Sequence, residues 1–408
     1  MKVIQINCIY EKGSTGKIVD DIHRYLKNKM IDSIVCYGRG KKVHRNNIYK
    51  VSSELEAKVH SLQSKLFGVE FSHSPIATKK MISIIENEKP DIVHLHCLNG
   101  HFINVYKLIE YLKDQKIQTV LTLHAEIMHT AGCEHAIQCE KWKSHCYSCN
   151  YIHGYISHYF RDDARYCFDL MERAIDQFET LTTVAVSDWL KDRAYKSAIF
   201  KGRKEKIVTI HNGVNTDVFY PRKQKKYLNK EEYDRKKPII LHVTPNFYHP
   251  LKGGSFIIEI ARSHPEWQIV IVGVNGSSPN FPTNVITIDK TNNQEELAQL
   301  YSDSNVTVIA SKRETFSMVC AESLCCGTPV VGFKCGGPES IFQNEFCHFV
   351  EYGRIDSLCD QIESVLQKKT DSIKCSAIAA EHFSVQKMCE NYADLYRKKL
   401  EKNHIIEL

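Results

Sequence analysis

Residues 305–333, NVTVIASKRETFSMVCAESLCCGTPVVGF, contain the pattern that decides the fold. An apolar, β-branched run at 305–310 is followed by a polar loop and then by a helical segment at 318–326. A second apolar run, at 328–333, comes directly after that helix. Strand, helix and strand in this order predict a parallel sheet with helices on both faces.

The same alternation extends over the whole chain. The other predicted strands are VIQINCI (3–9), IVCYG (34–38), DIVHLHC (91–97), TVLTLH (119–124), TTVAVS (182–187), IILHVT (239–244), WQIVIVG (267–273) and NVITI (284–288). The other predicted helices are 17–29, 74–89, 104–116, 253–263, 293–302, 356–368 and 384–401.

A chain of 408 residues is too long for one ordinary core, so we expect two domains. The charged, Pro-containing stretch 220–238 is the predicted linker. The predicted fold class is α/β, with two facing Rossmann-like, doubly wound domains at 1–221 and 222–383, and a C-terminal helix (384–408) that could pack back on the first. Such sheets bind ligands at the carboxyl ends of their strands, so the site is expected in a cleft between the domains.

Composition excludes several classes of protein. Hydrophobic residues make up 43% and charged residues 25%, which is typical of globular chains. The net charge of +6 is dispersed over 54 basic and 48 acidic residues, so it does not favour nucleic acid as a partner but suits anionic phosphates or an anionic membrane surface. No run of 18 apolar residues and no signal-peptide pattern occur, so a cytoplasmic protein with reduced cysteines is expected.

A Gly-rich turn, Gly13-Ser14-Thr15-Gly16, follows the first predicted strand and opens a helix expected to start at Lys17. Glycines let the backbone approach a ligand closely, and a helix N-terminus offers N–H groups and positive charge to a phosphate. The alternative is a tight β–α turn without a ligand.

Two glutamates flank the start of the helix at 318–326. Glu314 lies on the preceding loop and Glu322 just past the first helical turn, so both carboxylates can face one ligand. The N–H groups of Ser317, Met318 and Val319 would form a cradle for a diphosphate. The alternative is that both glutamates are ordinary surface residues.

The segment ETFSMVCAE (314–322) resembles the E-x7-E signature of the retaining glycosyltransferases of family 4, which have the GT-B fold. HNGVNTDVFYP (211–221) is similar to the domain-junction motif of that family, and GGPE (336–339) to its Gly-rich loop. The resemblance covers nearly the whole chain and is closest to bacterial polysaccharide-assembly members of the colanic-acid type.

The resemblance implies roles for these residues. Glu322 would hold the ribose hydroxyls of the nucleotide, and Glu314 would contact the donor sugar. The backbone from Phe316 to Val319 would take the diphosphate, together with the turn at 13–16.

Lys252 matches the lysine that neutralises the leaving diphosphate in this family. Many members have an arginine five residues earlier, where this chain has Phe247. Asn246, His249 or Arg313 could compensate for it, or one cation could suffice. The alternative for Lys252 is a solvated loop lysine.

His124 stands at the end of a predicted strand, where a ligand-facing residue is expected. In the family, a histidine in this place faces the donor sugar near the reacting carbon; the alternative is a buried histidine satisfied within the core. Close relatives often follow it with Asp, whereas Ala125 and Glu126 stand here, which makes Glu126 a candidate for contact with the acceptor.

A cysteine-rich insertion follows His124. Four cysteines within a short stretch that ends in C-x2-C could bind a structural zinc ion in tetrahedral geometry, and a nearby histidine could replace one of them. The alternatives are free thiols that pack a loop, or an oxidisable pair. The cysteines are Cys133, Cys139, Cys146 and Cys149, and the histidines are His129, His135, His145 and His153.

The resemblance thus predicts a retaining hexosyltransferase that moves a sugar from a UDP- or GDP-sugar to a glycan acceptor, expected to be lipid-linked, in bacterial surface polysaccharide biosynthesis. No D-x-D doublet lies in an apolar setting suited to a divalent cation, so no catalytic metal or cofactor is expected. Peripheral association with the inner face of the cytoplasmic membrane would be compatible with such an acceptor. The alternatives are a GT-B nucleotide-sugar epimerase, or an inactive homologue that serves as an assembly subunit.

Overall fold

A computed structural model describes residues 1–149, 162–203, 206–222, 237–274, 281–291 and 293–406. The chain forms two compact units, one of Met1–Ile210 with Met388–Leu408 and one of His211–Lys387. Most of the predicted linker, residues 223–236, lies outside the described residues. Among the described residues, no helix is long and apolar enough to cross a bilayer.

The first unit contains a seven-stranded parallel sheet with strand order β3-β2-β1-β4-β5-β6-β7. The predicted strands of this half are all present. Two strands of three residues each, β3 and β7, were not predicted, because such short segments carry no readable periodicity. The strands are β1 (Lys2–Ile9), β2 (Asp32–Arg39), β3 (Ile48–Lys50), β4 (Ile92–Leu95), β5 (Gln118–Leu123), β6 (Leu181–Ala185) and β7 (Ile207–Thr209).

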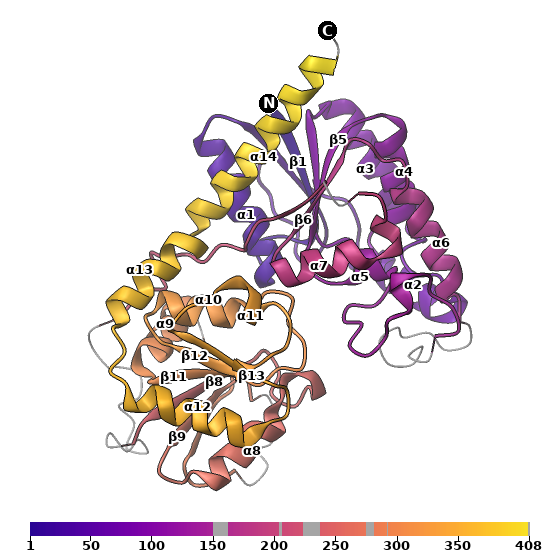
Figure 1. Cartoon of the computed structure of the whole chain (residues 1–408). Helices are drawn as coiled ribbons and strands as arrows, with labels where there is room; N and C mark the ends of the chain where they lie inside the picture. Colours follow the sequence, from indigo (N-terminus) through magenta and orange to yellow (C-terminus); the bar gives the residue numbers. More distant parts are fainter. Residues whose placement is uncertain (150–161, 204–205, 223–236, 275–280, 292, 407–408) are drawn as a thin grey trace. The chain divides into compact units, whose positions relative to one another are not determined.

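Helices cover both faces of this sheet, with α1 and α14 on one face and α3 and α4 on the other (Figure 1). The helices are α1 (Gly13–Asn28), α2 (Glu54–Phe67), α3 (Pro75–Glu88), α4 (Val105–Asp114), α5 (Ile127–Thr130), α6 (Ala164–Ile175), α7 (Asp188–Lys196) and the short turns η1 (Lys141–Lys143) and η2 (Ala198–Phe200).

The C-terminal helix α14 (Val385–Ile406) belongs to the first unit from Met388 onward. The hydroxyl of Tyr396 lies 2.6 Å from Nδ1 of His94 on β4, and that of Tyr392 lies 3.0 Å from Oγ1 of Thr122 on β5. Both tyrosines are fully buried, so this helix completes the core of the first unit.

One predicted helix of the first unit begins elsewhere, and the helices α2, α5, α6 and α7 were not predicted. The first helix starts at Gly13 and not at Lys17, because its apolar residues begin only at Ile18 and the preceding turn shows no helical spacing. Helix α2 was not predicted at all. Its large apolar side chains point to solvent, among them Leu55 and Leu62, so it lacks the usual division between buried and polar faces.

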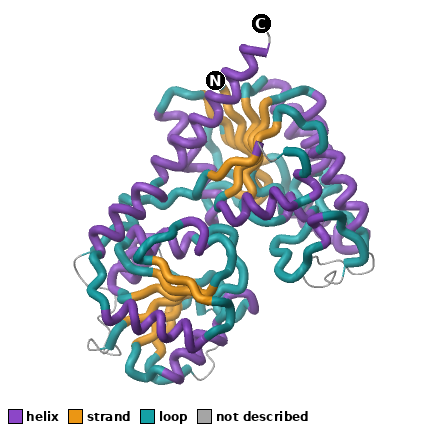
Figure 2. The backbone as a smooth tube through the Cα atoms, viewed as in Figure 1, coloured by secondary structure: helices purple, strands orange, loops and turns teal. Residues whose placement is uncertain are grey.

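The second unit contains a six-stranded parallel sheet with order β10-β9-β8-β11-β12-β13. The predicted strands of this half are present, and β13 is additional. They are β8 (Ile239–Val243), β9 (Gln268–Val272), β10 (Val285–Ile288), β11 (Val306–Ile309), β12 (Val330–Phe333) and β13 (Cys347–Val350). Figure 2 shows the strands of each sheet enclosed by helices.

The helices of the second unit again lie on both faces of the sheet (Figure 1). They are η4 (Pro250–Lys252), α8 (Gly254–Ser263), α9 (Gln294–Asp303), α10 (Met318–Cys325), α11 (Pro338–Ile341), α12 (Ile355–Gln367) and α13 (Ser372–Phe383).

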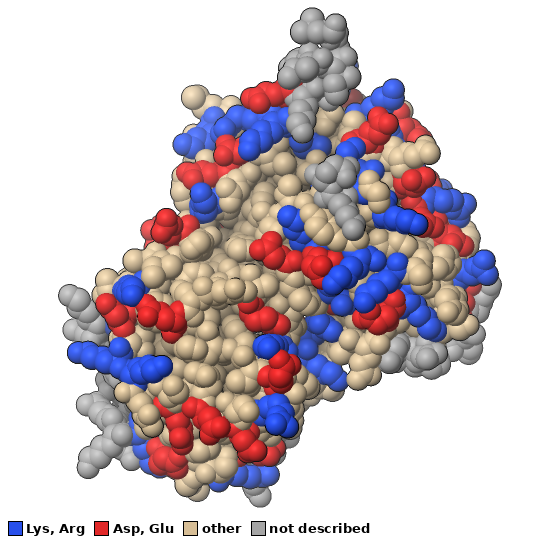
Figure 3. All heavy atoms as spheres, in the orientation of Figure 1, with Lys and Arg blue, Asp and Glu red and all other residues tan. Residues whose placement is uncertain are grey.

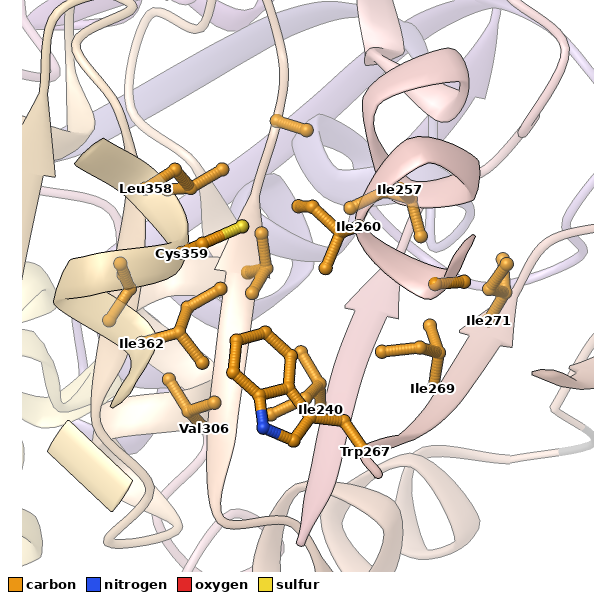
Figure 4. Packing of buried hydrophobic residues seen from close by; sticks show 14 of the residues in the cluster. Ile240, Ile257, Ile260, Trp267, Ile269, Ile271, Val306, Leu358, Cys359 and Ile362 are labelled. Carbon is orange, nitrogen blue, oxygen red and sulfur yellow. The ribbon is translucent and has the colours of Figure 1, made fainter. Parts of the chain in front are cut away.

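One face of this second sheet packs against α8 and α12. Ile257 and Ile260 of α8 and Leu358 and Ile362 of α12 meet side chains from the central strands around Trp267 (Figure 4). All of these residues are at most 3% exposed. This core holds the strands in place, so the loops at their carboxyl ends have a fixed base.

Candidate functional site

The loop that follows β11 leads into the helix α10, whose N-terminus is capped by a side chain. Ser317 is the N-cap, and its side chain accepts a hydrogen bond from the N–H of Cys320. Its φ of 75° is unusual for a residue other than glycine. The N–H groups of Ser317, Met318 and Val319 precede the first N–H that donates within the helix, that of Ala321, so helix geometry leaves them for another partner. Phe316, just before the cap, is buried and anchors the loop.

Glu322 lies in the second turn of α10. Its Oε2 accepts a hydrogen bond of 3.2 Å from the hydroxyl of Tyr301 on α9. Burial, together with the nearby carboxylate, raises the pKa of Tyr301 well above its usual value, so the phenol keeps its proton and remains a donor. Tyr301 therefore orients the carboxylate, a contact that the sequence did not indicate.

Lys252 and Glu314 meet, although 62 positions separate them. Nζ of Lys252 lies 2.7 Å from Oε1 of Glu314, and the side chains are 25% and 21% exposed. The backbone of Glu314 is held on both sides, because its N–H donates to the carbonyl of Cys335 and its carbonyl accepts from the N–H of Gly337. The two residues predicted to act on the donor are thus neighbours in the same unit.

The position of Lys252 is set by a close approach of backbones. Gly253 has a φ of 72°, and a Cβ on it would lie 2.1 Å from the carbonyl oxygen of Ala310, just after β11. The N–H of Lys312 also donates to the carbonyl of Leu251 at 2.8 Å. Only glycine fits at 253, and the turn η4 is therefore fastened to the carboxyl end of β11.

The Gly-rich segment after β12 is braced by Glu339. Its carboxylate accepts hydrogen bonds from the N–H groups of Cys335 (3.1 Å) and Gly336 (2.8 Å). A Cβ at Gly337 would lie 2.4 Å from the backbone of Thr315, so this loop also lies against the one that carries Glu314. The motif GGPE contains Glu339, but only the structure shows that its carboxylate braces this loop.

Phe247, where many family members have an arginine, is 4% exposed and packs in the core of the second unit. Its two polar neighbours cap the local turn. Asn246 accepts from the N–H of Tyr248, and His249 accepts from the N–H of Leu251. Phe247 brings no positive charge to this turn, so its positive charge comes from Lys252.

In the first unit, Gly13-Ser14-Thr15-Gly16 forms the first turn of α1 and not a loop before it. Asn7, near the end of β1, accepts from the N–H of Cys97 and donates to the carbonyl of Ile9 at 2.7 Å. Its amide also lies 3.5 Å from Oγ1 of Thr15. The N–H groups of the first turn are therefore presented at the carboxyl ends of β1 and β4.

His124 directly follows β5 and is partly exposed. Its Nε2 lies 3.2 Å from Nδ1 of His96, and the two rings stack with centroids 5.5 Å apart. Desolvation lowers the pKa of His124 to about 4, so the ring is neutral at physiological pH. His96 was not singled out, although the alternation His94-Leu95-His96 already places both histidines on one face of a strand.

The prediction that Glu126 contacts the acceptor was wrong. Glu126 is fully buried and accepts a hydrogen bond of 2.8 Å from Nε of Arg193 on α7. Burial alone would raise the pKa of Glu126, but His129, 3.6 Å away, and Arg193 lower it overall, so the group stays ionised. Arg193 also donates to the carbonyl of Ala136, so the pair anchors the cysteine-rich insertion to α7.

The four cysteines of the insertion gather in one region. Burial raises the pKa of Cys133, and the nearby thiols of Cys149, Cys146 and Cys139 raise it further. Among the described residues, however, no three Cys, His, Asp or Glu side chains are arranged to hold a metal ion. His153 lies outside the described residues. The thiols therefore do not form a ligand set in this arrangement, and zinc stays a prediction.

Two protein families match the chain, each over most of one unit. The family described as Glycosyltransferase Family 4 matches residues 15–218, half of the chain. The family described as Glycosyl transferases group 1 matches residues 223–382.

Individual proteins resemble the chain over nearly its full length. N-acetyl-alpha-D-glucosaminyl L-malate synthase of Bacillus anthracis is 22% identical over 96% of both chains. The structure of sucrose-phosphate synthase from Thermosynechococcus elongatus matches with a TM-score of 0.69 and 16% identity, over 98% of this chain and 100% of the other. Anabaena HepE in complex with UDP-glucose matches with a TM-score of 0.66 and 14% identity, over 98% and 100%. At such identities the structural matches show the fold alone, and they confirm the predicted GT-B fold.

Proposed function

Because the chain belongs to glycosyltransferase family 4, we propose that it is a retaining hexosyltransferase that transfers a sugar from a UDP- or GDP-sugar to a glycan acceptor. Membership of this family shows that the chain is a glycosyltransferase that acts on a nucleotide sugar. Retention, the identity of the sugar and the acceptor are part of the proposal.

The observation that carries the proposal is the meeting of Lys252, Glu314 and the start of α10 at the carboxyl ends of the second sheet. In our proposal Glu322 binds the ribose hydroxyls, and the N–H groups of residues 316–319 receive the diphosphate. Lys252 exchanges Glu314 for the diphosphate, and Glu314 then turns to the hydroxyls of the donor sugar.

In the proposed reaction, the acceptor oxygen attacks the anomeric carbon from the face that the leaving group occupies. The bond from that carbon to the phosphate oxygen breaks, and the acceptor proton passes to the leaving phosphate. Negative charge grows on the diphosphate as the bond breaks, so Lys252 and the positive end of α10 stabilise the transition state more than the ground state. These groups supply positive charge without a divalent ion, which supports a metal-independent reaction.

We propose that the first unit binds the acceptor and also contributes contacts to the donor. We assign His124 to the donor sugar near the reacting carbon, and the first turn of α1, residues 13–16, to the phosphates. Lys, Arg, Asp and Glu are interspersed over the visible face of each unit (Figure 3), so this face shows no continuous basic patch of the kind that binds nucleic acid.

We further propose a lipid-linked acceptor, used in bacterial surface polysaccharide biosynthesis at the inner face of the cytoplasmic membrane. Helix α2 supports peripheral binding to an anionic bilayer, because Leu55, Val59 and Leu62 are 74%, 46% and 53% exposed and share one face. Lys58 and Lys65 flank this apolar face. Sedimentation with vesicles that contain anionic lipid should carry the enzyme down, and Leu62→Glu should reduce that fraction; equal binding by both proteins would reject this surface.

Turnover assays distinguish the proposed activity from its alternatives. The purified protein should release UDP or GDP from a matching nucleotide sugar only after extracted lipid-linked glycans are added. An epimerase would convert the nucleotide sugar without an acceptor, and an inactive assembly subunit would do neither. Anomeric configuration of the product, read from its NMR coupling constant, tests retention.

A further inference from the structure

A buried chain of hydrogen bonds leads from α1 to His124. His96 follows β4 and His124 follows β5, two neighbouring parallel strands of the first sheet. On its other side, Nε2 of His96 lies 3.2 Å from Oε1 of Gln5 on β1. Gln5 and His96 are at most 2% exposed, so solvent does not compete for these contacts.

The amide of Gln5 can be oriented in only one way. Its Nε2 lies 3.3 Å from the carbonyl oxygen of Val19 on α1, which can only accept a hydrogen bond. The reversed amide would place two acceptor oxygens against each other and leave the buried nitrogen facing His96. Oε1 of Gln5 therefore faces His96, and the nitrogen of His96 that meets it must carry a proton.

The proton on His96 determines the proton on His124. Burial and the neighbouring rings of His94 and His124 lower the pKa of His96 well below its usual value, so this ring is neutral and has one N–H. Because that proton is on Nε2, Nδ1 of His96 is an acceptor. It lies 3.2 Å from Nε2 of His124, which must therefore be the donor. His124 is also neutral, so its own Nδ1 carries no proton.

His94 holds this arrangement without taking part in it. Its two ring nitrogens contact the hydroxyls of Tyr396 and Thr122, at 2.6 and 2.8 Å. Its ring packs on that of His96 with centroids 3.8 Å apart. His96 is thereby kept in the one orientation in which both of its nitrogens meet their partners.

We propose that Gln5 and His96 are positioning residues that keep His124 in the Nε2–H tautomer, so that its Nδ1 carries no proton and cannot donate a hydrogen bond to the donor sugar. This rests on the proposed function for the part that concerns the donor sugar. His124 therefore does not act as an acid toward the leaving group through Nδ1.

Nitrogen-15 NMR of the full-length, histidine-labelled protein tests the tautomer directly. Couplings from the ring nitrogens to the ring carbon-bound protons distinguish the two tautomers, and His124→Asn assigns the signal. We expect the ligand-free wild type to show a single Nε2–H form of His124. A proton on Nδ1, or a mixture, would overturn the proposal, and this measurement requires no variant to fold except for assignment.

Variants then test the cause. His96→Phe keeps an aromatic ring but removes the acceptor, so His124 should become a mixture of tautomers. His94→Phe, the matched control, should leave the tautomer of His124 unchanged. An unchanged tautomer in folded His96→Phe would reject the role of His96.

Failure of the proposed function would look different. If His124→Ala left turnover unchanged while the wild type showed the single tautomer, His124 would not contact the donor, although the hydrogen-bond chain would stand. A single tautomer together with a loss of turnover in His124→Ala supports both statements.

Discussion

Two ion pairs of similar length, one in each unit, differ in what surrounds them. Lys252 and Glu314 lie 2.7 Å apart on loops, with about a quarter of each side chain exposed. Arg193 and Glu126 make a contact of 2.8 Å, but Glu126 is fully buried. The guanidinium of Arg193 also lies over the ring of Trp142, 4.5 Å from its centroid.

The difference teaches that exposure, and not the contact distance, decides whether a ligand could replace one partner of an ion pair. Water can replace either partner of Lys252–Glu314, and a phosphate can replace Glu314, at small cost, because both side chains are partly solvated. Neither partner of Arg193–Glu126 can be replaced in this way, since an unpaired charge would remain in an apolar environment. Both glutamates were candidates for contact with a ligand; Glu314 remains one, whereas Glu126 pairs with Arg193 inside the first unit.

The largest expected effect is that of Glu126→Ala on stability. It leaves Arg193 buried without its carboxylate, which costs about 3–5 kcal/mol. Urea unfolding followed by circular dichroism measures this loss. Glu140→Ala, which removes an exposed pair with Lys143, is the control and should change the free energy of unfolding by about 0.5 kcal/mol or less. Equal effects of the two changes would contradict the contrast between the two units.

The next largest effect is that of Lys252→Ala on turnover. Loss of a cation that faces the growing charge should lower kcat by about 10²–10³-fold, with a smaller change in the KM for the nucleotide sugar. Lys312→Ala is a suitable control, because its ammonium lies over the ring of Tyr352, 5.9 Å from its centroid, and should reduce kcat less than twofold. A rise in KM alone would mean that Lys252 acts in ground-state binding.

A smaller effect is expected from Glu322→Ala on nucleotide affinity. Its charged hydrogen bonds to the ribose contribute about 1.5–3 kcal/mol, so titration calorimetry with UDP or GDP should show roughly ten- to 150-fold weaker binding. Tyr301→Phe removes only the hydroxyl that orients this carboxylate and should cost about 0.5–1.5 kcal/mol. Unchanged affinity in Glu322→Ala would remove this residue from the proposed site.

The smallest effect is expected from chelation. If Lys252 and the start of α10 supply the positive charge, EDTA should leave the initial rate within about 20% of the untreated enzyme, as expected for catalysis that needs no metal. Prompt loss of activity, restored by Mn²⁺ or Mg²⁺, would disprove metal independence. Elemental analysis of the same sample, purified without a His-tag, tests separately whether Cys133, Cys139, Cys146 and Cys149 bind zinc.

Much of the fold was readable from the sequence, because buried parallel strands are nearly continuous apolar runs. The runs at 239–244 and 305–310 became β8 and β11 with boundaries close to those predicted. The helix α2, with its exposed leucines, and the first turn of α1 were missed because hydrophobic periodicity reports burial and not helix formation itself. The helix α6 was also missed, although its apolar residues form one buried face.

The sequence by itself determined the two parallel sheets, the order of their elements and the segment with Glu314 and Glu322, since these depend on local patterns of apolar and polar residues. Only the tertiary structure decided which charged groups meet. It brought Lys252 to Glu314 across 62 positions and Glu126 to Arg193 across 67. It also joined Gln5, His96 and His124, because adjacent strands of a parallel sheet bring together residues that are far apart in the chain.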